Sequence, residues 1–240
     1  MNIHEYQAKR ILSRYGINIP KGGIAYTPNE AKRVASRSSL LGPWMLKAQI
    51  QSGARNKGYF LEKKAGNRGG VRLVKSRRDI IHQAEQMLGS TLVTVQTGPK
   101  GKLVSRVYVE SYVKVTSLFY AGLAVDRLNA ALTLLIAEIK DEDISQIALN
   151  APEKILKLKP KSAKSLEVFI NGLHHAFVDN DATMIEVNPA GVMKNGEIVA
   201  LDAKISFDDN GLYRHQDILR LHDDYEASER ELQAVKYRFT

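Results

Sequence analysis

Residues 184–204, MIEVNPAGVMKNGEIVALDAK, interleave polar and aliphatic side chains with a period of two around a turn signal. The signal is Lys194-Asn195-Gly196, and a three-residue loop with a left-handed glycine is a standard hairpin connection. This loop sets Asn188 opposite Asp202 and Glu186 opposite Lys204, on one face because side chains alternate along a strand. A two-residue turn would shift the register by one and separate Asn188 from Asp202. The three-residue hairpin is predicted because its other face is then wholly apolar: Ile185, Val187, Leu201 and Ala203.

Upstream of the hairpin, helix and strand patterns alternate along the chain. An amphipathic helix is predicted over residues 3–15, and Thr27-Pro28-Asn29-Glu30 is a capping box that starts a second helix. Strands are expected over 44–50, 71–75 and 91–97, with a helix over 76–89. From Arg106 onward, RVYVESYV, LFYAGLAVDR and ALTLLIA predict consecutive antiparallel strands. Further helices are predicted over 141–150, 161–177 and within 217–240.

These patterns predict an α+β protein with two α+β lobes, the second of which carries a mainly antiparallel sheet. The lobes are expected at about 21–100 and 101–214, with helix 3–15 packing on the second lobe. Residues 1–214 then form one domain, and 215–240 form a charged linker or helix.

Composition narrows the possible chemistry and the possible partners. The chain of 240 residues has no cysteine, which excludes disulfides, thiolate catalysis and cysteine-ligated metals. No apolar run approaches about 18 residues, and the start MNIHEYQAKR lacks the apolar core of a signal peptide. We therefore expect a cytoplasmic protein that does not bind a membrane. The formal charge of +9 favours anionic partners, but no aromatic platform accompanies the basic groups, so nucleic acid is not expected.

Two features upstream of the hairpin are typical of phosphate binding. Lys47 interrupts an apolar strand, so its ammonium must reach water or an anion such as phosphate. The following loop contains Ala54, Arg55 and Asn56, and its small residues allow backbone N–H groups to approach phosphate. Alternatives remain open: an edge-strand lysine in solvent, and a mobile basic loop.

Two further features suggest an adenine contact and a metal site. Glu110 and the backbone near Val113 lie at a strand end where they could read an adenine edge, although a solvated glutamate is the alternative. Asn188 and Asp202 offer the oxygen ligands that Mg²⁺ prefers, whereas the alternative is a surface hairpin with a Glu186–Lys204 ion pair. His174-His175 occupy adjacent helix positions that face different directions, so they are interpreted as ordinary helix residues.

Long segments of the chain resemble the ATP-grasp part of the β subunits of ADP-forming succinate–CoA and malate–CoA ligases. The resemblance is carried by MNIHEYQAKRILSRYGINIP, GPWMLKAQIQSGARNKG, GGVRLVKS, LVTVQTGPKGK, RVYVE, AGLAVDR and MIEVNPAGVMKNGEIVALDAKISFDDNGLYRH. TGPKGK, RVYVE and LDAKISFDDN are more similar to the malate enzymes. The resemblance implies an ATP-grasp fold that holds Mg-ATP between two lobes, and an acid–thiol ligase activity in which ATP phosphorylates a histidine of a partner α subunit.

The same resemblance implies roles for individual residues. Lys47 and Arg55 would bind and clamp phosphate as catalytic groups, with Ala54-Arg55-Asn56 as the phosphate loop. Glu110 and the Val113 backbone would face adenine. The Mg²⁺ ligands would be Asn188 and Asp202.

The sequence departs from the family pattern at several positions. The family has Gly-Arg-Gly where this chain has Ala54-Arg55-Asn56, and a glutamate where this chain has Leu118. A glycine-containing stretch expected after ALTLLIA is missing or altered, and the family's C-terminal ligase domain is expected to be absent. These departures leave an alternative function: a diverged, stand-alone ATP-grasp domain that binds nucleotide or protein without turnover.

Overall fold

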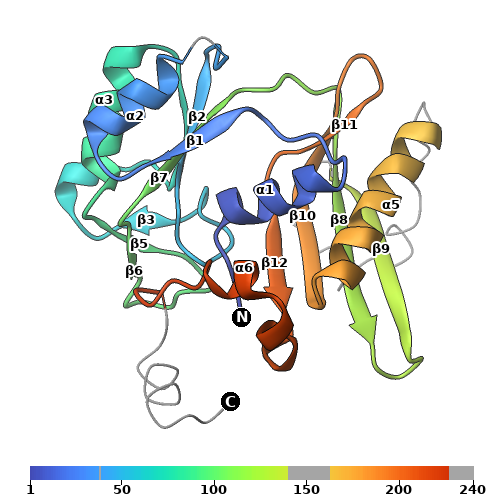
Figure 1. Ribbon diagram of the computed structural model, residues 1–240. Coiled ribbons are helices and arrows are strands. Elements are labelled where there is room, and N and C mark those ends of the chain that lie inside the picture. The colour runs from blue at the N-terminus through green and yellow to red at the C-terminus, as the bar shows by residue number, and fades with distance from the viewer. Residues whose placement is uncertain (38, 140–162, 227–240) are drawn as a thin grey trace, which may run out of the picture. The chain divides into compact units, whose positions relative to one another are not determined.

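The computed structural model describes residues 1–37, 39–139 and 163–226, which fall into two compact units (Figure 1). One unit is the contiguous segment Pro20–Tyr112, and the other combines Met1–Ile19 with Val113–Thr240. The division lies after Tyr112, later than the boundary near residue 100 that the sequence suggested, because the strand at 107–111 pairs within the first unit. The helix predicted over 141–150 and the final part of 217–240 lie outside the described residues.

The unit Pro20–Tyr112 is built on a four-stranded antiparallel sheet with the order β1-β7-β2-β4. Its strands are β1 (Gly22–Ala25), β7 (Val107–Ser111), β2 (Trp44–Ala48) and β4 (Val71–Val74). Helices α2 (Pro28–Ala35) and α3 (Arg77–Met87) pack against each other, as Figure 1 shows. A smaller sheet contains β3 (Tyr59–Phe60), β5 (Thr91–Val93) and β6 (Lys102–Leu103), and a short 3-10 helix, η1, spans Lys63–Ala65.

Both helices of this unit begin at caps that the sequence predicts. The Thr27 side chain accepts a hydrogen bond from the Glu30 N–H, and Pro28 occupies the first turn of α2. The Ser76 side chain likewise accepts from the Asp79 N–H at the start of α3. Each cap satisfies an N–H that the helix itself cannot pair. The apolar faces of the helices and sheet then bury a common core that includes Val34, Leu46, Ile80, Met87 and Val109.

The other unit is built on a five-stranded antiparallel sheet with the order β11-β10-β8-β9, in which β12 also pairs with β10. The strands are β8 (Ser117–Asp126), β9 (Ala131–Ile139), β10 (Ala182–Val192), β11 (Ile198–Ala200) and β12 (Lys204–Phe207). Helices α1 (Glu5–Arg14) and α5 (Ala163–Asp179) contact each other and the sheet. A 3-10 helix, η3 (Asp209–Arg214), and α6 (Gln216–Leu219) follow β12. The buried core includes Leu12, Phe119, Phe169, Leu173 and Ile185. This α+β architecture with a mainly antiparallel sheet confirms the predicted fold class.

The hairpin has the predicted turn and register. Met193 N–H donates to the Glu197 carbonyl at 2.8 Å, and Gly196 adopts φ +85°, so Lys194-Asn195-Gly196 is the connecting loop. Glu186 pairs with Lys204 across β10 and β12. The Asn188 N–H donates to the Asp202 carbonyl at 3.2 Å, which places these two residues opposite each other. The predicted core face is buried at Ile185, Val187 and Ala203 and half-buried at Leu201.

Within the described part of the chain, no helix combines the length and apolar character that crossing a membrane requires.

Candidate functional site

The polar face of the hairpin carries Glu186, Asn188, Asp202 and Lys204, and we call these four residues the hairpin site. All four side chains are half-buried. Asn188 Nδ2 donates to Glu186 Oε1 at 3.3 Å, and this contact directs the amide nitrogen toward the carboxylate. The Ala203 N–H donates to Asp202 Oδ1 at 2.8 Å. Each predicted metal ligand therefore has one side-chain oxygen or nitrogen engaged in a local hydrogen bond.

A local irregularity of β10 lies at the hairpin site. The register of β10 against β8 shifts between Val187 and Ala190, across Asn188 and Pro189. A bulge of this kind leaves an extra residue unpaired and changes the direction in which a side chain points. Asn188 therefore lies outside the regular pairing of β10 with β8, unlike Glu186 and Val187 before it.

Tyr120 of β8 lies beside the hairpin site, and the sequence analysis did not find it. Glu186 pairs across the sheet with Gly122, where an added Cβ would collide with the Tyr120 hydroxyl. The absence of that Cβ leaves room for the phenol. Burial, together with the nearby charge of Glu186, raises the pKa of Tyr120 to about 12. The hydroxyl, which is a hydrogen-bond donor at neutral pH like that of any tyrosine, therefore stays protonated further into the alkaline range. The sequence signal that could have identified Tyr120 is its position two residues before Gly122, on the same face of an alternating strand.

Helix α1 holds the second arm of the hairpin through a buried lysine. Lys9 Nζ donates to the Leu201 carbonyl at 2.6 Å and lies 2.8 Å from Glu5 Oε1. The side chains of Lys9 and Glu5 are 0% and 2% exposed. Because the Leu201 carbonyl immediately precedes Asp202, α1 restrains the backbone next to a predicted metal ligand.

The donor chemistry of the hairpin site fits Mg²⁺. Asn188 and Asp202 supply amide and carboxylate oxygens, the hard ligands that this ion takes, and it commonly completes its shell with water and phosphate oxygens. Over residues 1–37, 39–139 and 163–226, no group of three or more His, Cys, Asp or Glu side chains is arranged to hold a metal by itself. If an ion binds at this face, Asn188 and Asp202 are the predicted protein ligands.

Lys47 and Glu110 form a buried ion pair in the unit Pro20–Tyr112. Lys47 Nζ lies 2.7 Å from Glu110 Oε1, and the two residues are 5% and 1% exposed. Strand β2, which carries Lys47, lies between β7 and β4, so the alternative of an edge-strand lysine is wrong. The alternative of a solvated Glu110 is also wrong, because this residue is almost completely buried. The sheet therefore carries a buried ion pair that joins β2 to β7.

Hydrogen bonds to other segments hold the loop after β2 in place. Gly53 N–H donates to Gln96 Oε1 at 2.7 Å, and Ser52 Oγ lies 2.7 Å from Thr94 Oγ1. Arg55 is buried, and its Nη1 donates to the Ala48 carbonyl at 2.9 Å, one residue beyond Lys47. Asn56 is exposed. These contacts argue against the alternative of a mobile basic loop. We call Lys47, residues 53–57 and Glu110 the loop site.

Ala54 adopts a left-handed backbone conformation with φ +56°. L-residues with a Cβ disfavour this region, and glycine enters it freely. The loop thus keeps a glycine-like conformation at a position where the sequence provides alanine. Leu118, the other noted departure, lies on β8 opposite Gly191.

The predicted site residues fall into both units. Lys47, Arg55 and Glu110 belong to Pro20–Tyr112 and are linked through β2, whereas Asn188 and Asp202 belong to the other unit. Val113, the predicted adenine contact, is the first residue of the segment Val113–Thr240.

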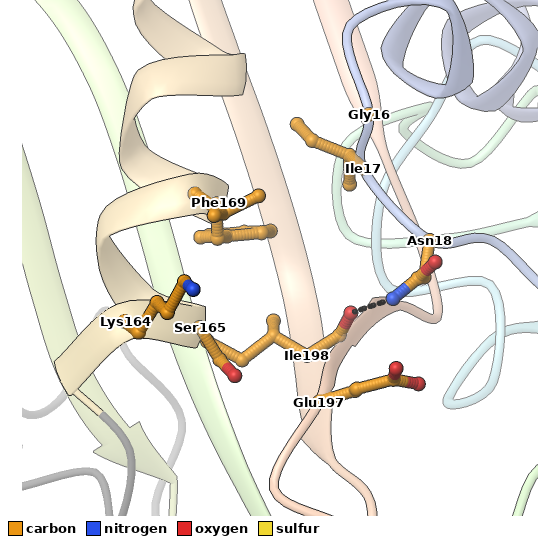
Figure 2. A pocket seen from close by; sticks show the side chains of 9 residues that line it. Gly16, Ile17, Asn18, Lys164, Ser165, Phe169, Glu197 and Ile198 are labelled. Atoms are coloured by element: carbon orange, nitrogen blue, oxygen red, sulfur yellow. Dashed lines mark hydrogen bonds between the residues drawn. The ribbon is translucent and has the colours of Figure 1, made fainter.

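A cavity of about 260 Å³ in the same unit is lined in part by Glu197 and Ile198 of the hairpin. Figure 2 shows its walls, where Asn18 Nδ2 donates to the Ile198 carbonyl at 3.3 Å, near Phe169 and Lys164 of α5. Phe169 and Ile198 belong to the apolar core. None of the predicted site residues lines this cavity.

Comparisons with known proteins agree with this architecture. A family model described as an ATP-grasp domain matches residues 2–167. The β subunit of succinate–CoA ligase [ADP-forming] from Rhodospirillum rubrum is 40% identical over 260 aligned positions, which cover 99% of this chain and 65% of the relative. The protein of the same name from Afipia carboxidovorans is 41% identical with the same coverage. The chain therefore spans 65% of the length of these curated relatives.

Solved structures with low sequence identity share the fold. A Methanosaeta concilii ATP citrate lyase matches with a TM-score of 0.66 and 16% identity, covering 98% of this chain and 58% of that chain. A dinucleotide-forming acetyl-coenzyme A synthetase of Ca. Korarchaeum cryptofilum matches with a TM-score of 0.57 and 14% identity, covering 86% and 93%.

Proposed function

Because this chain belongs to the ATP-grasp family, we propose that it is the Mg-ATP-binding part of the β subunit of an ADP-forming succinate– or malate–CoA ligase. The observation that carries the proposal is the 40% identity to a succinate–CoA ligase β subunit along 99% of the chain. The assignment would make the chain part of an acid–thiol ligase that works with an α subunit.

The proposed reaction is a sequence of group transfers. The terminal P–O bond of ATP breaks and a P–N bond forms to a histidine of the α subunit, releasing ADP. The phosphoryl group then passes to a carboxylate oxygen of the acid. The CoA thiol displaces phosphate from that acyl phosphate, which yields the thioester.

The residues of the loop site suit a role in binding and orienting phosphate. The Lys47 ammonium provides a point charge for phosphate oxygens, and Glu110 holds it in place within the sheet. Arg55 fixes the loop backbone through the Ala48 carbonyl, so that the N–H groups of Ala54 to Asn56 keep a constant arrangement for an anion. Such preorganised groups stabilise charge that is already directed toward the phosphoryl group.

The hairpin site would hold the metal through Asn188 and Asp202. When bound there, Mg²⁺ screens the charge of nucleotide phosphate oxygens. The Glu186 carboxylate receives the Asn188 amide N–H and so orients the amide oxygen for the ion. Glu110 and the Val113 backbone remain the proposed contacts of the adenine ring.

The charge distribution supports a strongly anionic ligand. Residues 20–112 contain 17 of the 35 lysines and arginines but 5 of the 26 acidic residues, which leaves +12 there and −3 elsewhere. A unit with this surplus attracts a polyphosphate by long-range electrostatics.

Calorimetric titration with Mg-ATP tests the proposal. We expect a dissociation constant of about 1 mM or tighter, weakened at least about tenfold by Lys47→Ala and by Asp202→Ala. Lys75→Ala and Asp217→Ala, which change exposed residues of the same types, serve as matched controls. Unchanged affinity in both site variants would overturn the assignment of these residues.

A transfer assay addresses the acid and the partner. Radiolabelled ATP, a candidate α subunit and either succinate or malate would be supplied together, and labelled phosphohistidine and acyl-CoA would be measured. TGPKGK and LDAKISFDDN favour malate, whereas the curated relatives named above favour succinate.

A second candidate function is nucleotide or protein binding without turnover. Leu118 in place of an acidic residue favours it, because an aliphatic side chain cannot bind a nucleotide by charge or hydrogen bond. Mg-ATP binding without any phosphohistidine on the α subunit would support this alternative, and labelled α subunit would reject it.

A further inference from the structure

Arg72 of β4 is a fully buried arginine outside the residues assigned above. It is 1% exposed and is among the largest fully buried side chains. Burial, together with the charge of Arg68, lowers the pKa of Arg72 to about 10, so the guanidinium still carries its charge at neutral pH. Its guanidinium carbon lies 5.4 Å from the centroid of the Phe60 ring. A buried charge in an apolar layer requires a complete set of hydrogen bonds.

The hydrogen bonds of Arg72 are made to neutral acceptors throughout the described residues. Nε donates to the Gly69 carbonyl at 2.9 Å, and Nη2 donates to the carbonyls of Ala65 at 2.9 Å and Arg68 at 3.0 Å. Nη1 donates to Gln83 Oε1 at 2.8 Å and to Gln86 Oε1 at 2.6 Å. These five bonds match the five N–H groups of a guanidinium. The planar fork thereby ties α3 to the segment 65–69.

The segment held by Arg72 supports the backbone of the loop site. The Gly70 N–H donates to the Arg55 carbonyl at 2.7 Å, and the Ala48 N–H donates to the Gly70 carbonyl at 2.7 Å. A Cβ added at Gly69 would collide with the Asn56 carbonyl, so the two segments are in close backbone contact. A shift of residues 65–69 would therefore displace Arg55 and Asn56 directly.

We propose that Arg72 is a positioning residue of the loop site, which fixes the segment 65–70 and thereby the backbone of Ala54 to Asn56 that receives the nucleotide phosphates. The inference rests on the proposed function for its ligand, but the restraint on the loop stands on geometry alone. The guanidinium also leaves its positive charge beside the loop, since its acceptors carry no negative charge. Lysine cannot replace it, because an ammonium has three donors and no planar fork.

Amide hydrogen exchange without nucleotide tests the restraint separately from ATP binding. In Arg72→Lys we expect the amides of Lys57, Gly58 and Gly70 to exchange at least about tenfold faster, because their acceptors in residues 54–55 lose their fixed position. The Mg-ATP dissociation constant should rise by about tenfold in the same protein. Arg78→Lys is the matched control, because Arg78 is an exposed arginine of α3 and is not one of the hydrogen-bond partners of Arg72 named above.

Gln86→Leu is the second variant, and it decides the question if Arg72→Lys does not fold. It removes the acceptor at 2.6 Å and leaves Gln83, so a smaller acceleration at the same three amides is expected. Unchanged exchange at Lys57, Gly58 and Gly70 in a folded variant would overturn the inference. Failure of the unaltered protein to bind Mg-ATP would instead overturn the proposed function, with the exchange result unaffected.

Discussion

Substitution of Lys9 by methionine tests how strongly α1 holds the hairpin. The change removes the ammonium that lies 2.8 Å from Glu5 Oε1 and 2.6 Å from the Leu201 carbonyl, while it keeps most of the apolar stem. Both charged side chains are almost completely buried, and removal of one partner from such a pair costs about 3–5 kcal/mol. The Leu201 carbonyl loses a donor in addition, which contributes about 1–3 kcal/mol. These two costs share one side chain, so we expect a total loss of about 3–5 kcal/mol.

Double substitution supplies the internal control for this magnitude. Lys9→Met with Glu5→Leu removes both charges, and replacing a buried pair by apolar residues is commonly close to neutral. We therefore expect the double variant to recover about 2 kcal/mol or more relative to Lys9→Met alone.

The assay must report the unit that contains α1. Trp44 is the sole tryptophan and lies in Pro20–Tyr112, so its fluorescence follows the other unit and serves as a reference. Denaturant-dependent amide exchange of α1 and β12 gives the free energy of interest. A loss below about 1 kcal/mol in Lys9→Met, or a double variant no more stable than the single one, would refute the reasoning.

Three further predictions concern single side chains. Ala54→Gly should stabilise the protein by about 0.5–1 kcal/mol in urea unfolding, because relief of the left-handed strain exceeds the added chain entropy; a loss of stability would contradict it. Hydrogen bonds from Arg214 and His215 lower the pKa of Asp181, so its contribution to stability is complete above the ordinary aspartate pKa and is lost as the pH falls through the lowered value. Melting temperatures between about pH 5 and pH 3 should therefore fall less steeply for Asp181→Asn than for the unaltered protein; an equally steep fall in both proteins would contradict this expectation. The raised pKa of Tyr120 predicts a tyrosine that ionises near pH 12 in ultraviolet titration and disappears in Tyr120→Phe; its stabilising contribution is present below the ordinary tyrosine pKa and is lost as the pH rises toward 12.

The sequence predicts best those parts of the structure that depend on residues close together in the chain. The register of the hairpin follows from a turn and from side-chain alternation within about 20 residues, and both are legible in the chain itself. The caps at Thr27 and Ser76 are local for the same reason.

Long-range strand order decides what the sequence does not show. The pair Lys47–Glu110 exists because β7 inserts between β1 and β2, although it follows them by a long stretch of chain. The same insertion moves the unit boundary to Tyr112. In the sequence, Arg72 is indistinguishable from other strand arginines, because its acceptors Gln83 and Gln86 lie on α3 and become its neighbours only in the fold. Contacts of this kind depend on which elements become neighbours, and residue spacing does not encode that choice.

The division of the chain has a consequence for its synthesis. Pro20–Tyr112 is contiguous and can begin to fold as soon as it leaves the ribosome, whereas Met1–Ile19 belongs to a unit whose sheet is completed by residues near 205. Ile11 and Leu12, buried in the finished protein, therefore stay exposed while almost the whole described chain is made. Residues 1–19 are translated before Pro20–Tyr112 but reach their place after it, and through that interval their apolar face can bind chaperones.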